Sequence, residues 1–210
     1  MNALREELAA VAARLVVEDG LDYASAKRKA VHRVLGPGAR TDMQPDNSEL
    51  RAHIERYLAV FHGQEHPRLL WQLRCAALSL MQAFAAFHPY LAGAVWNGTA
   101  TLHSGLHVLL FPDDPKEVEI HCIDMGIHYG TSQSAHYAGR GQVERLDLLW
   151  TAPAACGLAG ESLPATLGLY PAKDERGVLV HGARGAQGER GSLAALRALV
   201  EAGPPQPRPQ

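Results

Sequence analysis

Three side chains in the middle of the chain, His107, Glu119 and His121, have the chemistry of metal ligands. Imidazole and carboxylate groups suit divalent ions such as Zn²⁺, Ni²⁺ or Mn²⁺. Alternate residues of a strand point to one face, so a hairpin of 106–111 and 118–123 that pairs residue 107 with residue 121 would bring the three together. His103 has the same chemistry and precedes this hairpin. The spacing therefore predicts a divalent metal site on one face of a hairpin.

Two simpler interpretations compete with the metal site. The chain contains 11 histidines, and histidines on exposed strand positions are common. The segment Pro112-Asp-Asp-Pro115 adds two carboxylates between the predicted strands, but proline and aspartate stabilise tight turns by themselves. The metal site is therefore a hypothesis that depends on the hairpin.

A second group of candidates lies just before, in a stretch of small and hydroxyl-bearing residues that leads into an apolar strand. Backbone N–H groups of a glycine-rich turn can hold a phosphate without any metal. We therefore predict that this stretch binds a nucleotide or a phosphorylated small molecule. The predicted ligand-binding residues are Gly93, Ala94, Asn97, Gly98, Thr99 and Ser104.

Residues 91–111, called the signature segment below, resemble the active-site strand of small nucleotidyltransferases of the polymerase-beta-like superfamily. In that superfamily a glycine-serine turn after a helix is followed by Asp-x-Asp inside an apolar strand. Here Gly93-Ala94 takes the place of the turn, and Ser104-Gly105-Leu106-His107 takes the place of Ser-Asp-x-Asp. The spacing fits without a gap.

The resemblance implies a two-metal site whose carboxylates are missing. In the superfamily the two aspartates hold two Mg²⁺ ions that bind the triphosphate and activate the incoming hydroxyl. Gly105 has no side chain to bind a metal, His107 is a poor ligand for a hard cation, and Ala94 lacks a hydroxyl for phosphate. The third carboxylate of the superfamily comes from the paired strand, a place that Glu119 would fill. Nucleotidyl transfer is therefore expected to be impaired or absent.

The resemblance also narrows to one family. Residues 21–30 and 93–101 together are similar to a family of bacterial proteins of comparable length that are described as nucleotidyltransferase-like. Some of these proteins carry the label UDP-N-acetylmuramate–alanine ligase. Ligases of that kind need an ATP-binding phosphate loop and three domains, and this chain of 210 residues contains no such loop motif.

Hydrophobic periodicity predicts helices before the signature segment and strands after it. Apolar residues recur every three or four positions over 4–19, 23–35, 48–61 and 67–88, and the third helix has its face at Leu50, Ile54, Leu58 and Phe61. Strands are predicted at 106–111, 118–123, 145–151 and 165–170, followed by a mobile glycine-rich loop at 182–191 and a helix at 192–201.

These elements predict an α/β (α+β) fold. We expect a helical portion, residues 1–90, to pack on a small mixed, largely antiparallel nucleotidyltransferase-like sheet in residues 91–201. The tail, 202–210, is rich in proline, lacks apolar residues to bury and is expected to be disordered.

Composition limits the compartment and the partners. The N-terminus has the pattern of an amphipathic helix rather than a signal sequence, and no run of about 18 apolar residues occurs, so a cytoplasmic protein is expected. A net charge of −2 gives no general attraction to nucleic acid or to a membrane, and we expect neither as a partner. Cys75, Cys122 and Cys156 are far apart in the sequence and are expected to be reduced and buried.

Two further segments have polar side chains that could bind. Lys27-Arg28-Lys29, with Arg33 one turn on, could contact phosphate, although three consecutive charges on a helix usually form a solvated face. The polar aromatic segment 128–137 could line a pocket or simply be a loop.

We therefore expect a degenerate nucleotidyltransferase-like protein that binds a nucleotide or a phosphorylated small molecule. Two other classes stay open. One is a noncatalytic interaction or regulatory module whose first two helices, with residues 27–29, contact a partner protein. The other is a metal-dependent enzyme that uses His107, Glu119 and His121 to hold Mg²⁺, Mn²⁺ or Zn²⁺.

Overall fold

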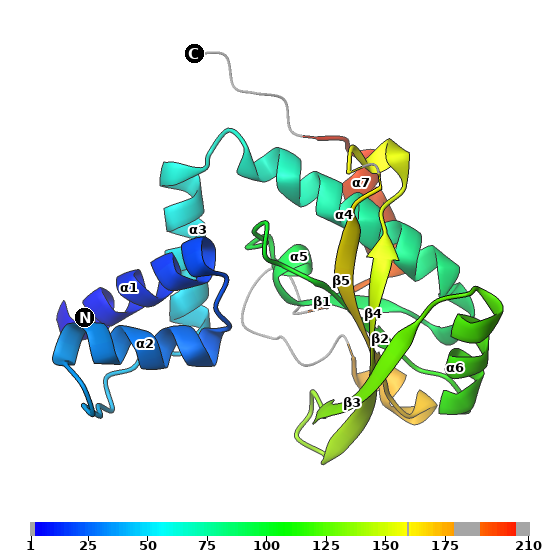
Figure 1. Ribbon diagram of the computed structural model, residues 1–210, viewed down its shortest axis with the longest axis horizontal. Coiled ribbons are helices and arrows are strands. Elements are labelled where there is room, and N and C mark those ends of the chain that lie inside the picture. The colour runs from blue at the N-terminus through cyan, green and yellow to red at the C-terminus, as the bar shows by residue number, and fades with distance from the viewer. Residues whose placement is uncertain (1–2, 159, 179–189, 205–210) are drawn as a thin grey trace. The chain divides into compact units, whose positions relative to one another are not determined.

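The computed structural model describes residues 3–158, 160–178 and 190–204, which divide into two compact units (Figure 1). The first unit comprises the described residues up to Leu69 together with Thr101–His103, and the second comprises the others. The division falls within helix α4 (His66–Ala83), whereas the sequence pattern changes near residue 90. Each unit has its own core.

Three helices share the core of the first unit: α1 (Ala3–Asp19), α2 (Tyr23–Leu35) and α3 (Asn47–Phe61). They confirm the first three predicted helices. The predicted core residue Phe61 is 65% exposed, so the buried face of α3 ends one turn earlier, at Leu58.

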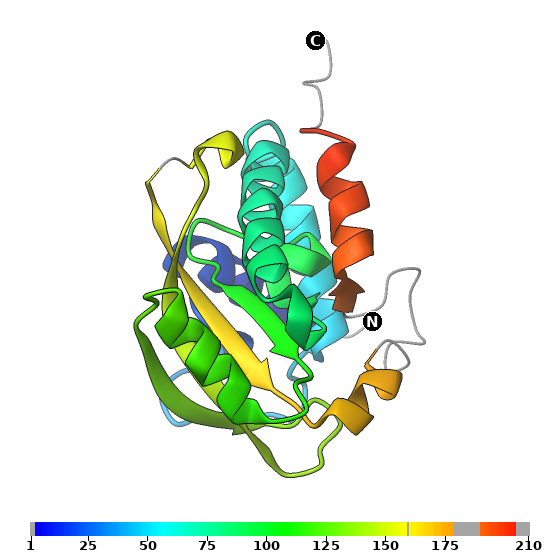
Figure 2. The same ribbon diagram turned by 90° about the vertical axis from the view of Figure 1, so that its right-hand side faces the viewer.

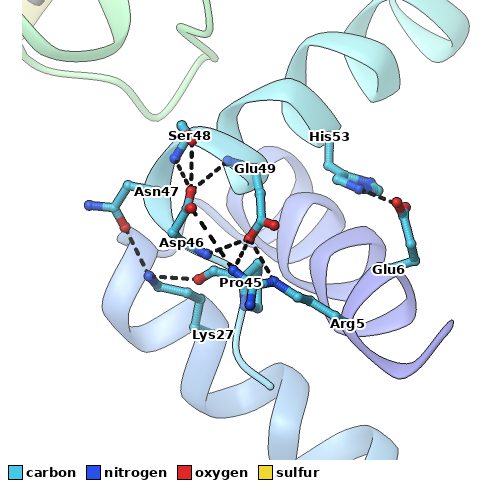
Figure 3. A network of polar contacts seen from close by, with 9 residues as sticks. All are labelled: Arg5, Glu6, Lys27, Pro45, Asp46, Asn47, Ser48, Glu49 and His53. Carbon is cyan, nitrogen blue, oxygen red and sulfur yellow. Dashed lines mark hydrogen bonds and ion pairs between the residues drawn. The ribbon is translucent and has the colours of Figure 1, made fainter. Parts of the chain in front are cut away.

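A polar network fixes the start of α3 (Figure 3). Asp46 accepts hydrogen bonds from the backbone N–H groups of Ser48 and Glu49, and the Glu49 side chain accepts from the backbone N–H of Asp46, which is a capping box. Arg5 of α1 donates to the same Glu49 carboxylate at 2.6 Å. The cap of α3 is thereby tied to α1.

In the described part of the second unit, six strands form one sheet in the order β3-β4-β5-β2-β1-β6. β2 and β5 run parallel, and all other neighbours run antiparallel. The predicted α+β class with a small mixed, largely antiparallel sheet is confirmed. The strands are β1 (Tyr90–Ala92), β2 (Leu106–Leu110), β3 (Tyr129–Ala135), β4 (Gln142–Thr151), β5 (Ser162–Leu169) and β6 (Arg190–Ser192).

Helix α4 packs on the apolar face of this sheet (Figure 2). Two further helices, α6 (Pro115–Asp124) and α7 (Leu193–Glu201), contact α4. Trp150 of β4 donates its indole N–H to the Ser79 hydroxyl of α4 at 2.9 Å. Trp71 of α4 donates to the carbonyl of Val200 in α7 at 3.0 Å. The Nε2 atom of His121 in α6 lies 2.9 Å from the carbonyl of the last residue of α4.

The prediction of a second hairpin strand is wrong, because residues 115–124 form helix α6. Asp114 caps this helix by accepting from the backbone N–H of Lys116 at 2.9 Å, and Pro115 occupies the first turn, where proline is favoured. Val118 and Cys122, one helical turn apart, are buried, whereas Ile120 is 57% exposed. The apolar residues that pack therefore follow a helical period and not the period of a strand.

Other segments differ in detail. Helix α4 ends at Ala83 and is followed by a short 3₁₀ turn, η1 (Ala85–Phe87), so the predicted helix ends early. The polar aromatic segment 128–137 is mostly strand β3. The predicted loop 182–191 and tail 202–210 fall largely outside the described residues, and the part of the loop that is described belongs to β6. The remaining short elements are α5 (Gly93–Asn97), η2 (Ala154–Cys156) and η3 (Ala172–Gly177).

The close packing of the β6 glycine, Gly191, against Trp96 can be tested by substitution. A Cβ atom at Gly191 would lie 2.1 Å from the ring of Trp96, which is itself buried and cannot yield easily. Gly191→Ala is expected to lower the free energy of unfolding by about 1–3 kcal/mol through overpacking, as measured by chemical denaturation. Gly130→Ala is the matched control in the other edge strand, β3, because nothing lies within 4 Å of its Cβ position. Equal effects of the two substitutions would contradict this packing.

Candidate functional site

One row of side chains crosses the polar face of the sheet. His107 of β2 pairs with Thr166 of β5, and Thr166 pairs with Asp147 of β4. Directly paired residues of neighbouring strands point to the same face, and Asp147 has the opposite parity to Trp150, which contacts α4. His107, Thr166 and Asp147, called the polar row below, therefore lie on the face away from α4.

Asp147 is held by two neighbours. Arg145, two residues earlier on β4, places its Nε atom 2.9 Å from Oδ1 of Asp147. Ser132 of β3 pairs with Arg145 in the sheet and donates its hydroxyl to Oδ2 of Asp147 at 2.6 Å. Desolvation acts to raise the pKa of Asp147, but the hydrogen bonds from Ser132 and Arg145 outweigh it and lower that pKa overall. Asp147 is therefore a charged, oriented carboxylate at neutral pH.

His107 is neutral at pH 7 and lies beside the glycine turn. Its Nδ1 atom is 2.7 Å from the Thr166 hydroxyl oxygen. His107 keeps an exposed edge, but the surrounding protein partly desolvates its ring; this desolvation, and then the positive charge of Arg145, lower the pKa of His107 against the opposing effect of Asp147. A Cβ atom at Gly93, which has φ +72°, would lie 3.0 Å from Cδ2 of His107. The glycine turn and the strand of the signature segment thus meet at this ring.

The other predicted ligand-binding residues follow Gly93 along α5 and the segment after it. The backbone N–H groups of Gly98 and Thr99 both donate to the carbonyl of Ala94 at 3.0 Å, so these two amides are used within the chain. Thr99 is only 2% exposed, and its hydroxyl has no hydrogen-bond partner among the described residues. Asn97 and Ser104 are half-buried. Gly93 is the residue of this group that the structure brings to the polar row.

The three predicted metal ligands do not meet. His107 of β2 has Thr166 as its partner, and Glu119 of α6 accepts a hydrogen bond from the Tyr129 hydroxyl at 3.0 Å. His121 bonds the end of α4 instead. Their predicted shared face is wrong because α6 replaces the second hairpin strand. Within the described ranges no three or more His, Cys, Asp or Glu side chains are placed to hold a metal ion.

The basic cluster of α2 is engaged inside the first unit. Lys27 donates to the carbonyl of Pro45 at 3.2 Å and to the side chain of Asn47 at 2.9 Å, at the start of α3 (Figure 3). The Nζ atom of Lys29 lies 2.9 Å from the Asp19 carboxylate. These cations stabilise the helical unit, which weakens the argument that they contact a phosphate or a partner.

Sequence reasoning missed Asp147, Arg145 and Thr166, whereas Ser132 lies in the polar aromatic segment 128–137 that was predicted either to line a pocket or to be a loop. A signal for two of them was present: Arg145 and Asp147 occupy alternate positions in a predicted strand whose intervening residues are leucines. Charged residues at every second position of an otherwise apolar strand indicate that one face of the strand is not packed in the core and is available for binding. Thr166, and the contact of Ser132 with Asp147, become visible only through the strand pairing.

Comparison of the chain with protein-family models, with curated proteins and with solved structures gives no match. Among the helices in the described ranges, none is both long and apolar enough to cross a membrane. The polar row and the signature segment are therefore the features that bear on function.

The environment of His107 predicts its titration. The pKa of its imidazole in the folded protein should lie below the ordinary value of 6.5. The unfolded chain therefore takes up this proton at a higher pH than the folded chain does. As the pH falls from 6.5 through the folded-state pKa, the contribution of His107 to the free energy of unfolding is lost. An NMR titration of the His107 ring measures this directly. Arg145→Gln removes a repelling cation and should raise the midpoint, whereas Asp147→Asn should lower it. A wild-type midpoint at or above 6.5 would contradict the described environment.

Proposed function

We propose that this chain is a degenerate nucleotidyltransferase-like protein that binds a nucleotide or a phosphorylated small molecule on the polar face of its sheet, without two-metal nucleotidyl transfer. One observation carries the proposal. Gly93, the glycine of the turn in the signature segment, packs against His107, and His107 stands in register with Thr166 and Asp147. The glycine turn and the strand of the signature segment thus both contribute to the polar row.

The chemistry of this face suits a ligand with both phosphate and hydroxyl groups. The guanidinium of Arg145 and the hydroxyl of Thr166 can donate to phosphate oxygens. Arg190 of β6 pairs with Ala92, as His107 does, but its guanidinium lies over the Tyr137 ring, 4.4 Å from the ring centroid, and is not a donor of the polar row. The Asp147 carboxylate repels phosphate but accepts hydrogen bonds from sugar hydroxyls. A nucleotide or a sugar phosphate offers both groups.

Loss of metal-dependent transfer is supported by the positions that would carry the aspartates. Position 105 is glycine, and a Cβ atom there would lie 3.0 Å from the carbonyl oxygen of Pro164, a tight contact with the backbone of β5. Position 107 is a neutral histidine. Mg²⁺ is usually held by one or two carboxylates together with substrate phosphates, and Asp147 is already bonded to Arg145 and Ser132. Binding is therefore proposed to be independent of Mg²⁺.

A protein partner is the second candidate. Ile120 and Ile123 on the outer side of α6 are 57% and 66% exposed, and they form the apolar surface that such a partner would cover. Binding through α6 would not require the polar row, so substitutions at the row separate the two functions.

Ligand binding is tested by titrating ATP, AMP and pyrophosphate into the protein in EDTA and then in Mg²⁺, by calorimetry and thermal shift. At least one of these ligands should raise the melting temperature in EDTA, because it binds the native state, and Mg²⁺ should not be required. Arg145→Gln and Thr166→Val should each weaken binding about tenfold, since each removes a hydrogen bond worth about 1–2 kcal/mol.

The matched controls are Arg176→Gln and His128→Ala, two exposed residues of the same unit that are not members of the polar row. Both should bind as the wild type does. The melting temperatures of all four ligand-free variants show whether the fold is kept. An absence of binding by every ligand, binding that requires Mg²⁺, or equal losses in the control variants would contradict the proposal.

A further inference from the structure

Two of the three cysteines lie side by side although 81 positions separate them in the sequence. Cys75 belongs to α4, and Cys156 ends η2 in the connection between β4 and β5. The Sγ atom of Cys156 is 2.6 Å from that of Cys75, and both are thiols. This separation is well inside the ordinary contact distance of nonbonded heavy atoms, about 3.5–4.0 Å, and approaches the length of a disulfide bond, about 2.05 Å.

An independent contact holds the same two elements together. Gln72, one turn before Cys75 on α4, donates its side-chain N–H to the carbonyl of Gly157 at 3.2 Å. Gly157 has φ +73°, and a Cβ atom there would lie 2.7 Å from Nε2 of Gln72. The same face of α4 therefore contacts both Cys156 and the residue after it. The cysteine pair is a consequence of this packing and not of one side-chain conformation.

The two thiols differ in access. Cys75 is half-buried, whereas Cys156 is only 1% exposed. Burial, and then the hydrogen bond to Cys75, raise the pKa of the Cys156 thiol to about 12. Cys156 therefore keeps its proton and donates it toward Cys75, so an oxidant from solvent reaches Cys75 first.

We propose that Cys75 and Cys156 are a redox modification site that closes to an intramolecular disulfide with a peroxide. The Cys75 thiol loses its proton, the resulting thiolate attacks one oxygen of hydrogen peroxide and the O–O bond breaks; Cys75 becomes a sulfenic acid, and the departing hydroxide takes up the released proton to form one water. The Cys156 sulfur then attacks the Cys75 sulfur, loses its proton and releases a second water as the S–S bond forms. Two thiols lose two electrons in total, and one peroxide becomes two waters. This inference does not depend on the proposed ligand.

The test uses the full chain, treated with hydrogen peroxide and then denatured and alkylated. The reduced protein has three free thiols, and the treated protein should have one. Cleavage after lysine and arginine places the three cysteines in separate peptides, 75–116, 117–140 and 146–173, so mass spectrometry identifies the linked pair. The crosslinked peptide should contain 75–116 and 146–173, and a dithiol reductant should restore three thiols.

Cys122→Ser is the matched control, because Cys122 is buried in α6 and its pKa is raised to about 11, chiefly by burial. This variant should still lose two thiols, whereas Cys75→Ala and Cys156→Ala should lose none to a crosslink. The oxidised wild type should also melt on the order of 10 °C higher than the reduced protein, because the crosslink restricts the unfolded chain.

Three results would overturn the proposal: three free thiols after peroxide, a crosslink that contains Cys122, or a sulfinic acid at Cys75 without a crosslink. The peptide map of the wild type decides among them even where the Cys156→Ala variant does not fold.

Discussion

The alternation of side chains along β2, β4 and β5 is the constraint on which the rest of the second unit depends. Each strand sends large apolar residues to the face that α4 covers, and β4 does so with Leu146, Leu148 and Trp150. The intervening positions of the same strands carry His107, Asp147 and Thr166. A slip of one residue in these pairings would place His107, Asp147 or Thr166 under the helices and turn a core leucine to the opposite face, so the same packing that forms the core also fixes the polar row.

This arrangement is the physical basis for proposing a binding site that needs no metal ligands. Hydrogen bonds from Ser132 and Arg145 lower the pKa of the Asp147 carboxyl, and partial desolvation together with the charge of Arg145 lowers the pKa of His107 beside it. These groups are oriented by the backbone of a sheet and not by a bound ion. Such a row can recognise phosphate and hydroxyl groups by fixed donors and acceptors, whereas nucleotidyl transfer needs several carboxylates that converge on metal ions.

The sequence predicted the parts of the fold that are governed by local patterns. Helices α1, α2 and α3 follow from apolar periodicity alone. The segment 115–124 was misjudged because Val118, Ile120 and Cys122 fit a period of two as well as they fit a helix, and the pair Asp114-Pro115 can start a helix as readily as it can form a turn. Gly93 and His107 were named in two separate groups of candidates, and their contact is visible only in the structure. Thr166 could not be found, because its place beside His107 depends on which strands pair across the sheet, and pairing over long sequence distances leaves no local pattern.

The central claim is that the polar row binds a phosphorylated ligand without a metal ion. Protein-observed NMR of the isotope-labelled chain, titrated with ATP in the presence of EDTA, tests it most directly. Binding at the polar row should cause saturable chemical-shift changes of the His107 ring, the Thr166 amide and the Arg145 side chain, and should leave the resonances of α6 unchanged. Shifts confined to α6, or a spectrum that ATP, AMP and pyrophosphate all leave unchanged, would contradict it.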